Sequence, residues 1–427
     1  MSLQSSVVPQ QWKASKIKPI AKISQPNTAS DYRPISITSV LSRLTERIVV
    51  SDYLYPAFAS PPDGLTFNHQ YAFRPTGSTT AALISMFQVI TNMLETEDFV
   101  RVIALDFSKA FDTVKHAPMM EKVNKLDMPS SVCNWINDFL TGRSHTTDFY
   151  NSTSASKRIN ASVVQGSAIG PAAFSVVSSD LVAKYSCNVL KMFADDSYLI
   201  IAASNLSTTG DELCHIGNWS SNNNLQLSIK KCKEIIFYNP RRNKLFTHPP
   251  LVPGIERVTE LKCVGVTVTS TLSFTPHISN VIGACSSNLF ALYTLRSKGL
   301  ANELLHTVFC ATTLTKLLYA SPFWWGFTTA QEQERLEAFL RRAKRGGFYV
   351  QNKSFAELCA SADNRLFTQI CSNTTHVLAS CLPPISSHPY NTRKNLSSGN
   401  FQIPTKRSAL GDKNFINRMI IRNSLTI

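Results

Sequence analysis

Short apolar runs alternate with amphipathic stretches over the first 270 residues of the chain. Helix-like stretches lie around residues 40–50 and 78–94. Apolar runs of strand length follow, bounded by turn-forming residues, which is the pattern of buried or half-buried strands. These runs span residues 101–107, 190–194, 197–202, 234–238 and 261–268. Strands that alternate with helices predict an α/β or α+β arrangement.

The pattern becomes helical after residue 277. Six apolar residues lie at helical spacing on one face, namely Ile278, Val281, Ile282, Cys285, Leu289 and Leu292. A second helix is predicted to end at about Arg345, because Gly346 and Gly347 follow it and glycine commonly ends helices. Past Ser386 the chain is rich in Ser, Asn, Pro and Thr, and we expect less order there.

The excess of basic residues indicates which kinds of partner the protein binds. The 427 residues include 43 Lys and Arg against 28 Asp and Glu, a formal net charge of +15. This charge favours nucleic acid, and less strongly an anionic membrane surface. The apolar runs are shorter than the ~20 residues that span a bilayer, so we expect no membrane crossing. The ten cysteines form no CxxC pair, which favours free thiols in a reducing compartment.

Acidic residues interrupt the apolar runs at two places. Asp106 follows residues 102–105, and Asp195 with Asp196 separates two apolar runs, which predicts a tight hairpin with adjacent carboxylates at its tip. Like charges on a rigid sheet destabilise each other unless divalent cations lie between them, and Mg²⁺ prefers such oxygen ligands. Each place also has an ordinary explanation, because Asp106 could cap the next turn and aspartate is a common turn residue.

A glycine-containing loop, VVQGSAIGP, lies between the two acidic places at residues 163–171. Gly166 and Gly170 would let a ligand approach the backbone, and Gln165 offers both a hydrogen-bond donor and an acceptor. The chain has no GxxxxGK[ST] sequence, and no GxGxxG opens a helix after a strand. P-loop and Rossmann nucleotide sites therefore have no support.

These segments, in this order, resemble the reverse transcriptases of non-long-terminal-repeat retrotransposons, or long interspersed elements, and the jockey-like branch in particular. ALDFSKAFDTV, VVQGSAIGP and FADDSYLI resemble polymerase motifs A, B and C of that family. KPIAK, DYRPISIT and QYAFRPTGSTTAAL resemble its finger blocks, LQLSIKKCKEIIF its motif D, LKCVGVTVTSTLSFTPHI its primer grip, and SPFWWGF with RLEAFLRRAKRGGF its thumb. The resemblance covers about residues 10–350. Val164 and Thr269 depart from the usual proline and aspartate, but neither change removes a metal ligand.

The resemblance implies an α+β fold of the right-hand polymerase type. Its palm would be an antiparallel sheet with helices, its fingers would be truncated at the N-terminus, and its thumb would be helical. Fingers and part of the palm would occupy residues 1–100, the palm with the catalytic motifs and primer grip 101–270, and the thumb 271–350. Residues 351–427 would form a basic, partly disordered extension.

The resemblance also implies an RNA-directed DNA polymerase that extends a DNA primer, or the target DNA, on an RNA template from deoxynucleoside triphosphates. Asp106, Asp195, Asp196 and the Phe107 carbonyl would hold two Mg²⁺ ions, with Mn²⁺ as an alternative. One ion would activate the primer 3′-hydroxyl, and the other would stabilise the leaving pyrophosphate. Lys231 matches the motif D lysine that donates a proton to pyrophosphate, although a solvated turn is the ordinary explanation.

Five further residues match nucleotide-binding positions of the family. Lys22 and Arg33 would bind the triphosphate, Arg74 the template or nucleotide, and Gln165 with Gly166 the incoming nucleotide. Lys22 and Arg33 could instead be solvated surface charges, because the N-terminal fingers that carry them would be truncated.

Phe111 stands five residues after Asp106, where the family keeps an aromatic ring that excludes the ribose 2′-hydroxyl. We therefore expect DNA synthesis, although an ordinary core position would also suit a phenylalanine. Asp112 lies one residue further on and is interpreted as a cap of the turn, not as a metal ligand.

Two other classes of function stay open. A catalytically inactive relic, or a domesticated RNA-binding protein, would keep the fold and the basic groove without catalysis. A metal-dependent nuclease or phosphatase would use the acids, but would leave Phe111 and the Gln165–Gly166 loop unexplained. An endonuclease domain is expected upstream in a full-length element and is expected to be absent here. Because a target-primed element must reach chromatin, we expect the nucleus and the cytoplasm as locations.

Overall fold

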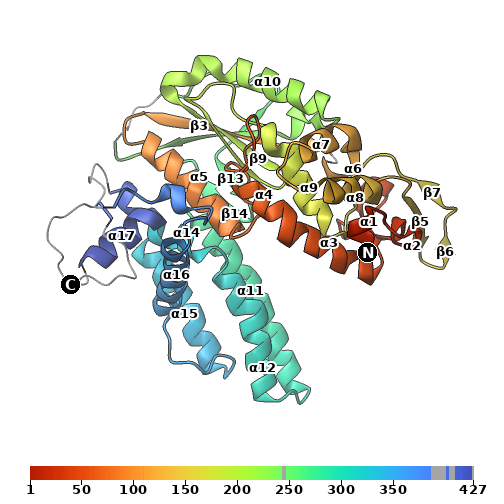
Figure 1. Cartoon of the computed structure of the whole chain (residues 1–427). Helices are drawn as coiled ribbons and strands as arrows, with labels where there is room; N and C mark the ends of the chain where they lie inside the picture. The colour runs from red at the N-terminus through yellow and green to blue at the C-terminus, as the bar shows by residue number, and fades with distance from the viewer. Residues whose placement is uncertain (109, 243–246, 386–400, 403–408, 426–427) are drawn as a thin grey trace. The chain divides into compact units, whose positions relative to one another are not determined.

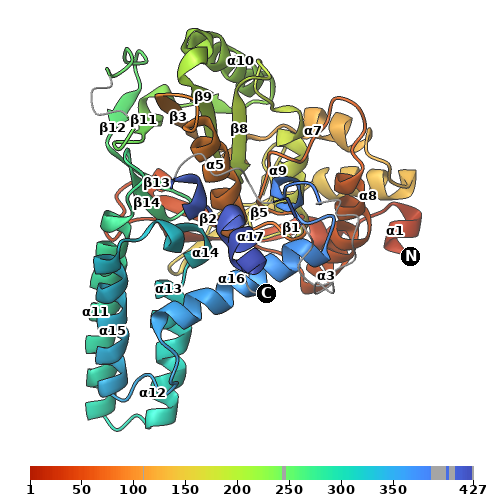
Figure 2. The same ribbon diagram turned by 90° about the vertical axis from the view of Figure 1, so that its left-hand side faces the viewer.

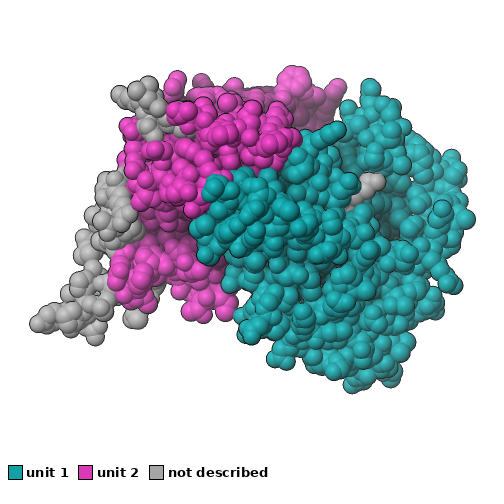
Figure 3. All heavy atoms as spheres, turned by 90° about the horizontal axis from the view of Figure 1, so that it is seen from above, with its two compact units in different colours: residues 1–75, 104–199, 207–232 teal, residues 76–103, 200–206, 233–427 magenta. Residues whose placement is uncertain are grey.

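The computed structural model describes residues 1–108, 110–242, 247–385, 401–402 and 409–425. The chain divides into two compact units, which Figure 3 colours separately. Unit 1 comprises residues 1–75, 104–199 and 207–232, and unit 2 comprises residues 76–103, 200–206 and 233–427. The chain thus crosses between the units several times. The predicted division into fingers, palm, thumb and extension stays a prediction.

Unit 1 begins with a small mixed sheet. Strand β1 (Ala14–Ala21) pairs antiparallel with β2 (Tyr32–Ile37) and parallel with β5 (Ser144–Phe149). Helix α3 (Val40–Val49) follows β2 and confirms the helix predicted at residues 40–50. Because Lys22 directly follows β1 and Arg33 lies on β2, this sheet brings the two basic residues to one end of a strand pair.

Every residue of helix α9 (Ile169–Val177), labelled in Figure 1, is buried except Pro171. A helix that is apolar all round is a core helix. It contacts α3 and α7 (His116–Val123), and α7 in turn contacts α8 (Ser130–Leu140). The loop that carries Gln165 and Gly166 therefore enters a helix whose position is fixed by packing on several sides.

Both acidic places lie at strand ends in unit 1. Strand β8 (Val189–Phe193) neighbours β9 (Asp196–Ala202) in the sheet with only two residues between them, which confirms the predicted hairpin. Strand β4 (Phe107–Ser108) follows Asp106 and pairs antiparallel with β10 (Gln226–Leu227). Helix α10 (Thr209–Asn222) precedes β10.

Unit 2 contains β12 (Glu256–Val258), β11 (Lys233–Tyr238) and most of β3 (Phe99–Leu105), which lie in that order in the sheet. Strands β11 and β12 are parallel, so the prediction of an antiparallel palm sheet is wrong for this pair. The connection over residues 239–255 is long enough to return the chain for parallel pairing. The single strand predicted at residues 261–268 is instead a hairpin of β13 (Glu260–Cys263) and β14 (Val266–Thr269), because Val264 and Gly265 take positive φ angles of 42° and 87°.

Helices make up most of the described part of unit 2. Helix α5 (Thr79–Met93) confirms the prediction at residues 78–94, and α11 (Thr275–Ser297) contacts both α12 (Asn302–Val308) and α15 (Ala330–Arg345), as Figure 2 shows. A capping box of Thr329 and Glu332 begins α15, and Gly347 at φ 74° follows its end. Helix α11 is long and apolar enough to span a membrane by length and composition alone, but core helices meet the same criteria.

The C-terminal range holds two described helices, α16 (Phe355–Ser372) and α17 (Phe415–Leu425). The predicted loss of order past residue 386 falls largely on residues 386–400 and 403–408, which lie outside the described residues. None of the ten cysteines, all of which are described, forms a disulfide. Shorter α-helices and strands among the described residues are α1 (Ser2–Ser5), α2 (Gln10–Lys13), α4 (Tyr55–Ala59), α6 (Ala110–Thr113), β6 (Ser152–Thr153), β7 (Lys157–Arg158), α13 (Thr315–Leu317) and α14 (Ser321–Trp324).

Candidate active site

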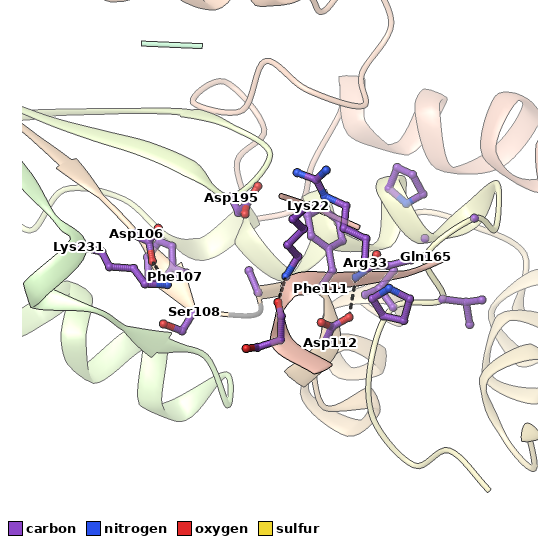
Figure 4. Close-up of a pocket in the computed structure, with 18 residues that line it drawn as sticks. Lys22, Arg33, Asp106, Phe107, Ser108, Phe111, Asp112, Gln165, Asp195 and Lys231 are labelled. Atoms are coloured by element: carbon purple, nitrogen blue, oxygen red, sulfur yellow. Dashed lines mark hydrogen bonds and ion pairs between the residues drawn. The ribbon is translucent and has the colours of Figure 1, made fainter. Parts of the chain in front are cut away.

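A cavity of about 730 Å³ lies within unit 1, and Figure 4 draws the side chains that line it. The lining comes from segments far apart in the sequence: the ends of β1 and β2, the β3–β4 junction, α6, the loop before α9, the β8–β9 turn and Lys231. Every residue predicted to form the site lies on this wall except Asp196 and Arg74. The fold thus gathers most of the predicted site into one cavity.

Asp106 lies between β3 and β4. Its backbone carbonyl accepts a hydrogen bond from the Ser228 amide at 2.9 Å. The Lys231 ammonium lies 3.7 Å from its carboxylate, and Figure 4 shows the two side chains directed toward each other. Both side chains are substantially exposed, at 64% for Lys231 and 44% for Asp106, so this ion pair adds little to stability.

Asp195 occupies the turn between β8 and β9, and Asp196 begins β9. Burial raises the pKa of Asp195, and the Asp106 carboxylate raises it further, while Arg33 opposes the shift. Loss of hydration raises the pKa of Asp196 to about 6, with contributions from Asp195 and Asp106. The three carboxylates therefore repel one another, and the repulsion is strongest when all three are ionised.

These carboxylates suit a magnesium site that substrate phosphates complete. Within the described residues, no three His, Cys, Asp or Glu side chains are already gathered at metal-binding spacing. Mg²⁺ is commonly held by one or two carboxylates together with substrate phosphates and water, so such a gathering is not required. The buried carboxylate oxygen of Asp106, Oδ1, accepts no hydrogen bond from the described residues and has the Lys231 ammonium 3.7 Å away, so a cation bound there would replace this ion pair.

Phe111 lies in α6, on the cavity wall. Its ring stacks on Phe174 with centroids 4.4 Å apart and meets Phe73 edge-on at 6.3 Å. These contacts fix the ring while one part of it lines the cavity. Phe111 is therefore both a packing residue and a wall residue, so the two explanations predicted for it are compatible.

Gln165 is held by Asp112. The Gln165 side-chain amide donates to the Asp112 carboxylate at 2.6 Å, and both residues line the cavity. The interpretation of Asp112 as a turn cap missed this contact, because its partner lies 53 residues away in the sequence. Asp112 thus orients the Gln165 amide through a charge-assisted hydrogen bond.

The backbone at Gly166 packs against strand β2. Gly166 has a φ of 109°, and a Cβ built on it would lie 2.4 Å from the Ser36 carbonyl oxygen. The neighbouring Gln165 carbonyl accepts a hydrogen bond from the Ser36 amide at 2.7 Å. Only glycine permits this approach, because any side chain would displace the backbone of β2.

The basic residues predicted to bind the nucleotide separate into two groups. Lys22 and Arg33 are exposed on the cavity wall, and the Lys22 ammonium donates to the Ser30 carbonyl at 2.8 Å. Arg74 does not line the cavity, and its guanidinium donates to the carbonyl oxygens of Phe67 and Gln70. Its predicted contact with template or nucleotide stays a prediction.

Glu46 is a functional candidate that the sequence pattern did not indicate. It is fully buried, and its carboxylate accepts hydrogen bonds from the backbone amides of Ala168 at 2.7 Å and Ile169 at 3.2 Å, at the start of α9. Ser42, one turn earlier in α3, donates to the same carboxylate at 2.8 Å. A carboxylate at a helix N-terminus is stabilising, so Glu46 anchors the helix that follows Gln165 and Gly166.

Curated relatives match most of the chain. This chain is 26% identical over 360 residues to the probable RNA-directed DNA polymerase from transposon X-element of Drosophila melanogaster. That alignment covers 79% of this chain and 38% of the relative. It is 25% identical over 292 residues to the RNA-directed DNA polymerase from mobile element jockey of the same species, covering 64% of this chain and 31% of that protein. The chain thus spans well under half the length of these relatives.

Telomerase from Candida tropicalis aligns with 79% of this chain and 60% of its own at a TM-score of 0.47 and 14% identity. The family description reverse transcriptase (RNA-dependent DNA polymerase) matches residues 20–268, which include every residue of the cavity wall. The chain therefore belongs to the reverse transcriptase family and is related to the enzymes of the non-LTR retrotransposons jockey and X-element.

Proposed function

We propose that this chain is an RNA-directed DNA polymerase that adds deoxynucleotides to the 3′ end of a DNA primer on an RNA template. The observation that carries the proposal is the meeting of Asp106, Asp195, Phe111 and Gln165 on one cavity wall. Family membership supports the same reaction, because the X-element and jockey relatives carry the name RNA-directed DNA polymerase.

Asp106, Asp195, Asp196 and the Phe107 carbonyl would hold two Mg²⁺ ions, with Mn²⁺ as an alternative. When bound, the ions would supply activation of the primer hydroxyl and stabilisation of charge on the phosphates. The mutual repulsion of the three carboxylates supports this assignment, because bound cations would relieve it.

The side chains of the wall would then position the nucleotide. Lys22 and Arg33 would contact its phosphates, Lys as a point charge and Arg as a two-pronged donor. Phe111 would close the space where a ribose 2′-hydroxyl would lie. Gln165, held by Asp112, would contact the base or sugar, and Lys231 would donate a proton to the leaving pyrophosphate.

Primer extension on an RNA template with Mg²⁺ tests the proposal, with RNA binding measured in parallel. The parent should extend the primer, and Asp195→Ala should fold, bind RNA and not extend it. Asp127→Ala is the matched control, because Asp127 is exposed and does not line the cavity. If Asp195→Ala folds normally and extends primers at the parental rate, the metal assignment is wrong.

The same assay separates the alternative functions. RNA binding by the parent without extension would support an inactive relic or a domesticated RNA-binding protein. Net cleavage of a labelled strand would support a nuclease. For an active enzyme that copies its element onto target DNA, we propose action in the nucleus after passage through the cytoplasm, which fractionation of a tagged chain would test.

A further inference from the structure

The segment around Gln70 forms an extra strand-like partner for β8. Gln70 bridges Met192 in a parallel arrangement. The Met192 amide donates to the His69 carbonyl at 2.7 Å, and the Tyr71 amide donates to the Met192 carbonyl at 2.9 Å. This pairing places the Gln70 side chain beside the turn that follows β8.

The Gln70 side-chain amide binds both backbone groups of one turn residue. Its oxygen accepts from the Ala194 amide at 2.8 Å, and its nitrogen donates to the Ala194 carbonyl at 3.1 Å. The same oxygen accepts from the Ala72 amide at 3.1 Å, and the nitrogen lies 3.4 Å from the Ser178 hydroxyl. Gln70 is only 1% exposed, so its full hydrogen-bonding capacity is used inside the protein.

Ala194 needs such support because of its backbone conformation. Its φ is 58°, in the left-handed region that is unfavourable for a residue with a Cβ. Ala194 directly precedes Asp195, so any relaxation of its backbone would move the Asp195 carboxylate.

We propose that Gln70 is a positioning residue that holds the Ala194–Asp195 turn in the geometry needed to bind the divalent cations. This inference rests on the proposed function, because it concerns the same carboxylates. Arg74 also helps to hold the backbone of Gln70, since its guanidinium donates to the Gln70 carbonyl at 3.3 Å. Arg74 does not line the cavity, which is consistent with a role in shaping this loop.

The test compares Gln70→Leu, which removes all four hydrogen bonds at similar size, with Gln70→Glu, which keeps the accepting oxygen and loses the donors. Gln369→Leu is the matched control, because Gln369 is exposed on α16 in unit 2. Three quantities are measured for each chain: Mn²⁺ affinity of the nucleic-acid-free protein by electron paramagnetic resonance, the Mg²⁺ concentration for half-maximal primer extension, and the thermal unfolding midpoint.

Both Gln70 variants should bind Mn²⁺ about 10- to 100-fold more weakly and need correspondingly more Mg²⁺, as is usual when a residue that orients a metal ligand is lost. Adding Ala194→Gly to Gln70→Leu should recover part of the loss, because glycine takes a positive φ without a Cβ clash. Gln369→Leu should match the parent in all three quantities.

A folded Gln70→Leu or Gln70→Glu with parental Mn²⁺ affinity and Mg²⁺ requirement would overturn the proposal, even if its unfolding midpoint fell. If Gln70→Leu does not fold, Gln70→Glu decides the question alone. Should the parent fail to extend primers, the proposed function fails, while the Mn²⁺ affinities still decide the role of Gln70. A parent that neither extends primers nor binds Mn²⁺ would overturn both.

Discussion

Replacement of Gly166 by alanine should disturb the loop that carries Gln165, because an added methyl group has no room there. The new Cβ would lie 2.4 Å from the Ser36 carbonyl oxygen, which is backbone of β2 and cannot rotate away. The loop must therefore move, and the hydrogen bond from the Ser36 amide to the Gln165 carbonyl, 2.7 Å long, would break or stretch.

Two contributions set the size of the effect. A φ of 109° is outside the regions that alanine adopts readily, which costs roughly 1–3 kcal/mol. Loss of one partly buried backbone hydrogen bond costs about 1 kcal/mol more. We therefore expect Gly166→Ala to lower the free energy of unfolding by roughly 2–4 kcal/mol and to raise the KM for the deoxynucleotide, because Gln165 moves with the loop.

Two other glycines separate the contributions. Gly142 has a φ of 67° and no atom within 4 Å of a built Cβ, so Gly142→Ala reports the backbone conformation alone. Gly217 lies in α10 with the same open space, so Gly217→Ala should stabilise the protein by about 0.5–1 kcal/mol. Urea unfolding followed by circular dichroism gives the free energies, and steady-state primer extension gives the KM.

The free energies of unfolding of the three variants, and the KM of Gly166→Ala, test these two causes. If Gly166→Ala loses no more stability than Gly142→Ala, the close contact with Ser36 contributes nothing. A Gly166→Ala enzyme with a parental KM would instead show that the loop does not position the nucleotide.

Three further changes address other parts of the chain. Phe111→Val should raise the incorporation of ribonucleotides relative to deoxyribonucleotides about tenfold or more, because it removes ring area from the cavity wall. Single-nucleotide extension measures this ratio. An unchanged ratio would favour a packing role alone for Phe111. Glu234→Gln should lower the free energy of unfolding by about 3–5 kcal/mol, because the fully buried Glu234 carboxylate forms ion pairs with Arg101 at 2.6 Å and Arg257 at 2.7 Å. A much smaller loss in urea unfolding would contradict this. Burial raises the pKa of Asp363 to about 6, above its ordinary value of 3.8. Because the unfolded chain loses this proton at a lower pH than the folded one, the free energy of unfolding of the parent should fall as pH rises from 4 to 6. Asp363→Asn should lack roughly 2–3 kcal/mol of that fall, and identical pH profiles of unfolding for the two proteins would refute the shift.

The positions of the main acidic residues follow from local sequence. Asp106 ends an apolar run, and Asp195 with Asp196 interrupts another, so strand periodicity alone places them at strand ends. Helices α5 and α11 are readable in the same way, because their apolar residues recur at helical spacing. The order of the motifs along the chain indicates the reverse transcriptase family, and the match of the family description over residues 20–268 confirms it.

Helix α3 shows where local pattern is insufficient. Its apolar residues Leu41, Leu44 and Ile48 are exposed at 62%, 49% and 48%, whereas the polar residues Ser42 and Glu46 are fully buried. Besides Ser42, the buried carboxylate has its partners at the start of α9, more than 120 residues away. A polar residue can be buried only where distant groups satisfy it, and nothing in the helix itself indicates those groups.

The sequence by itself thus determined several of the helices and strands, the acidic strand ends and the family. Only the tertiary structure decided that Gln165 is held by Asp112 and that Gln70 binds the Ala194 turn. It also decided that β12 runs parallel to β11. The physical reason is range: periodicity and turn propensity act over a few residues, whereas hydrogen-bond partners and strand pairing are chosen by segments that meet only after the chain has folded.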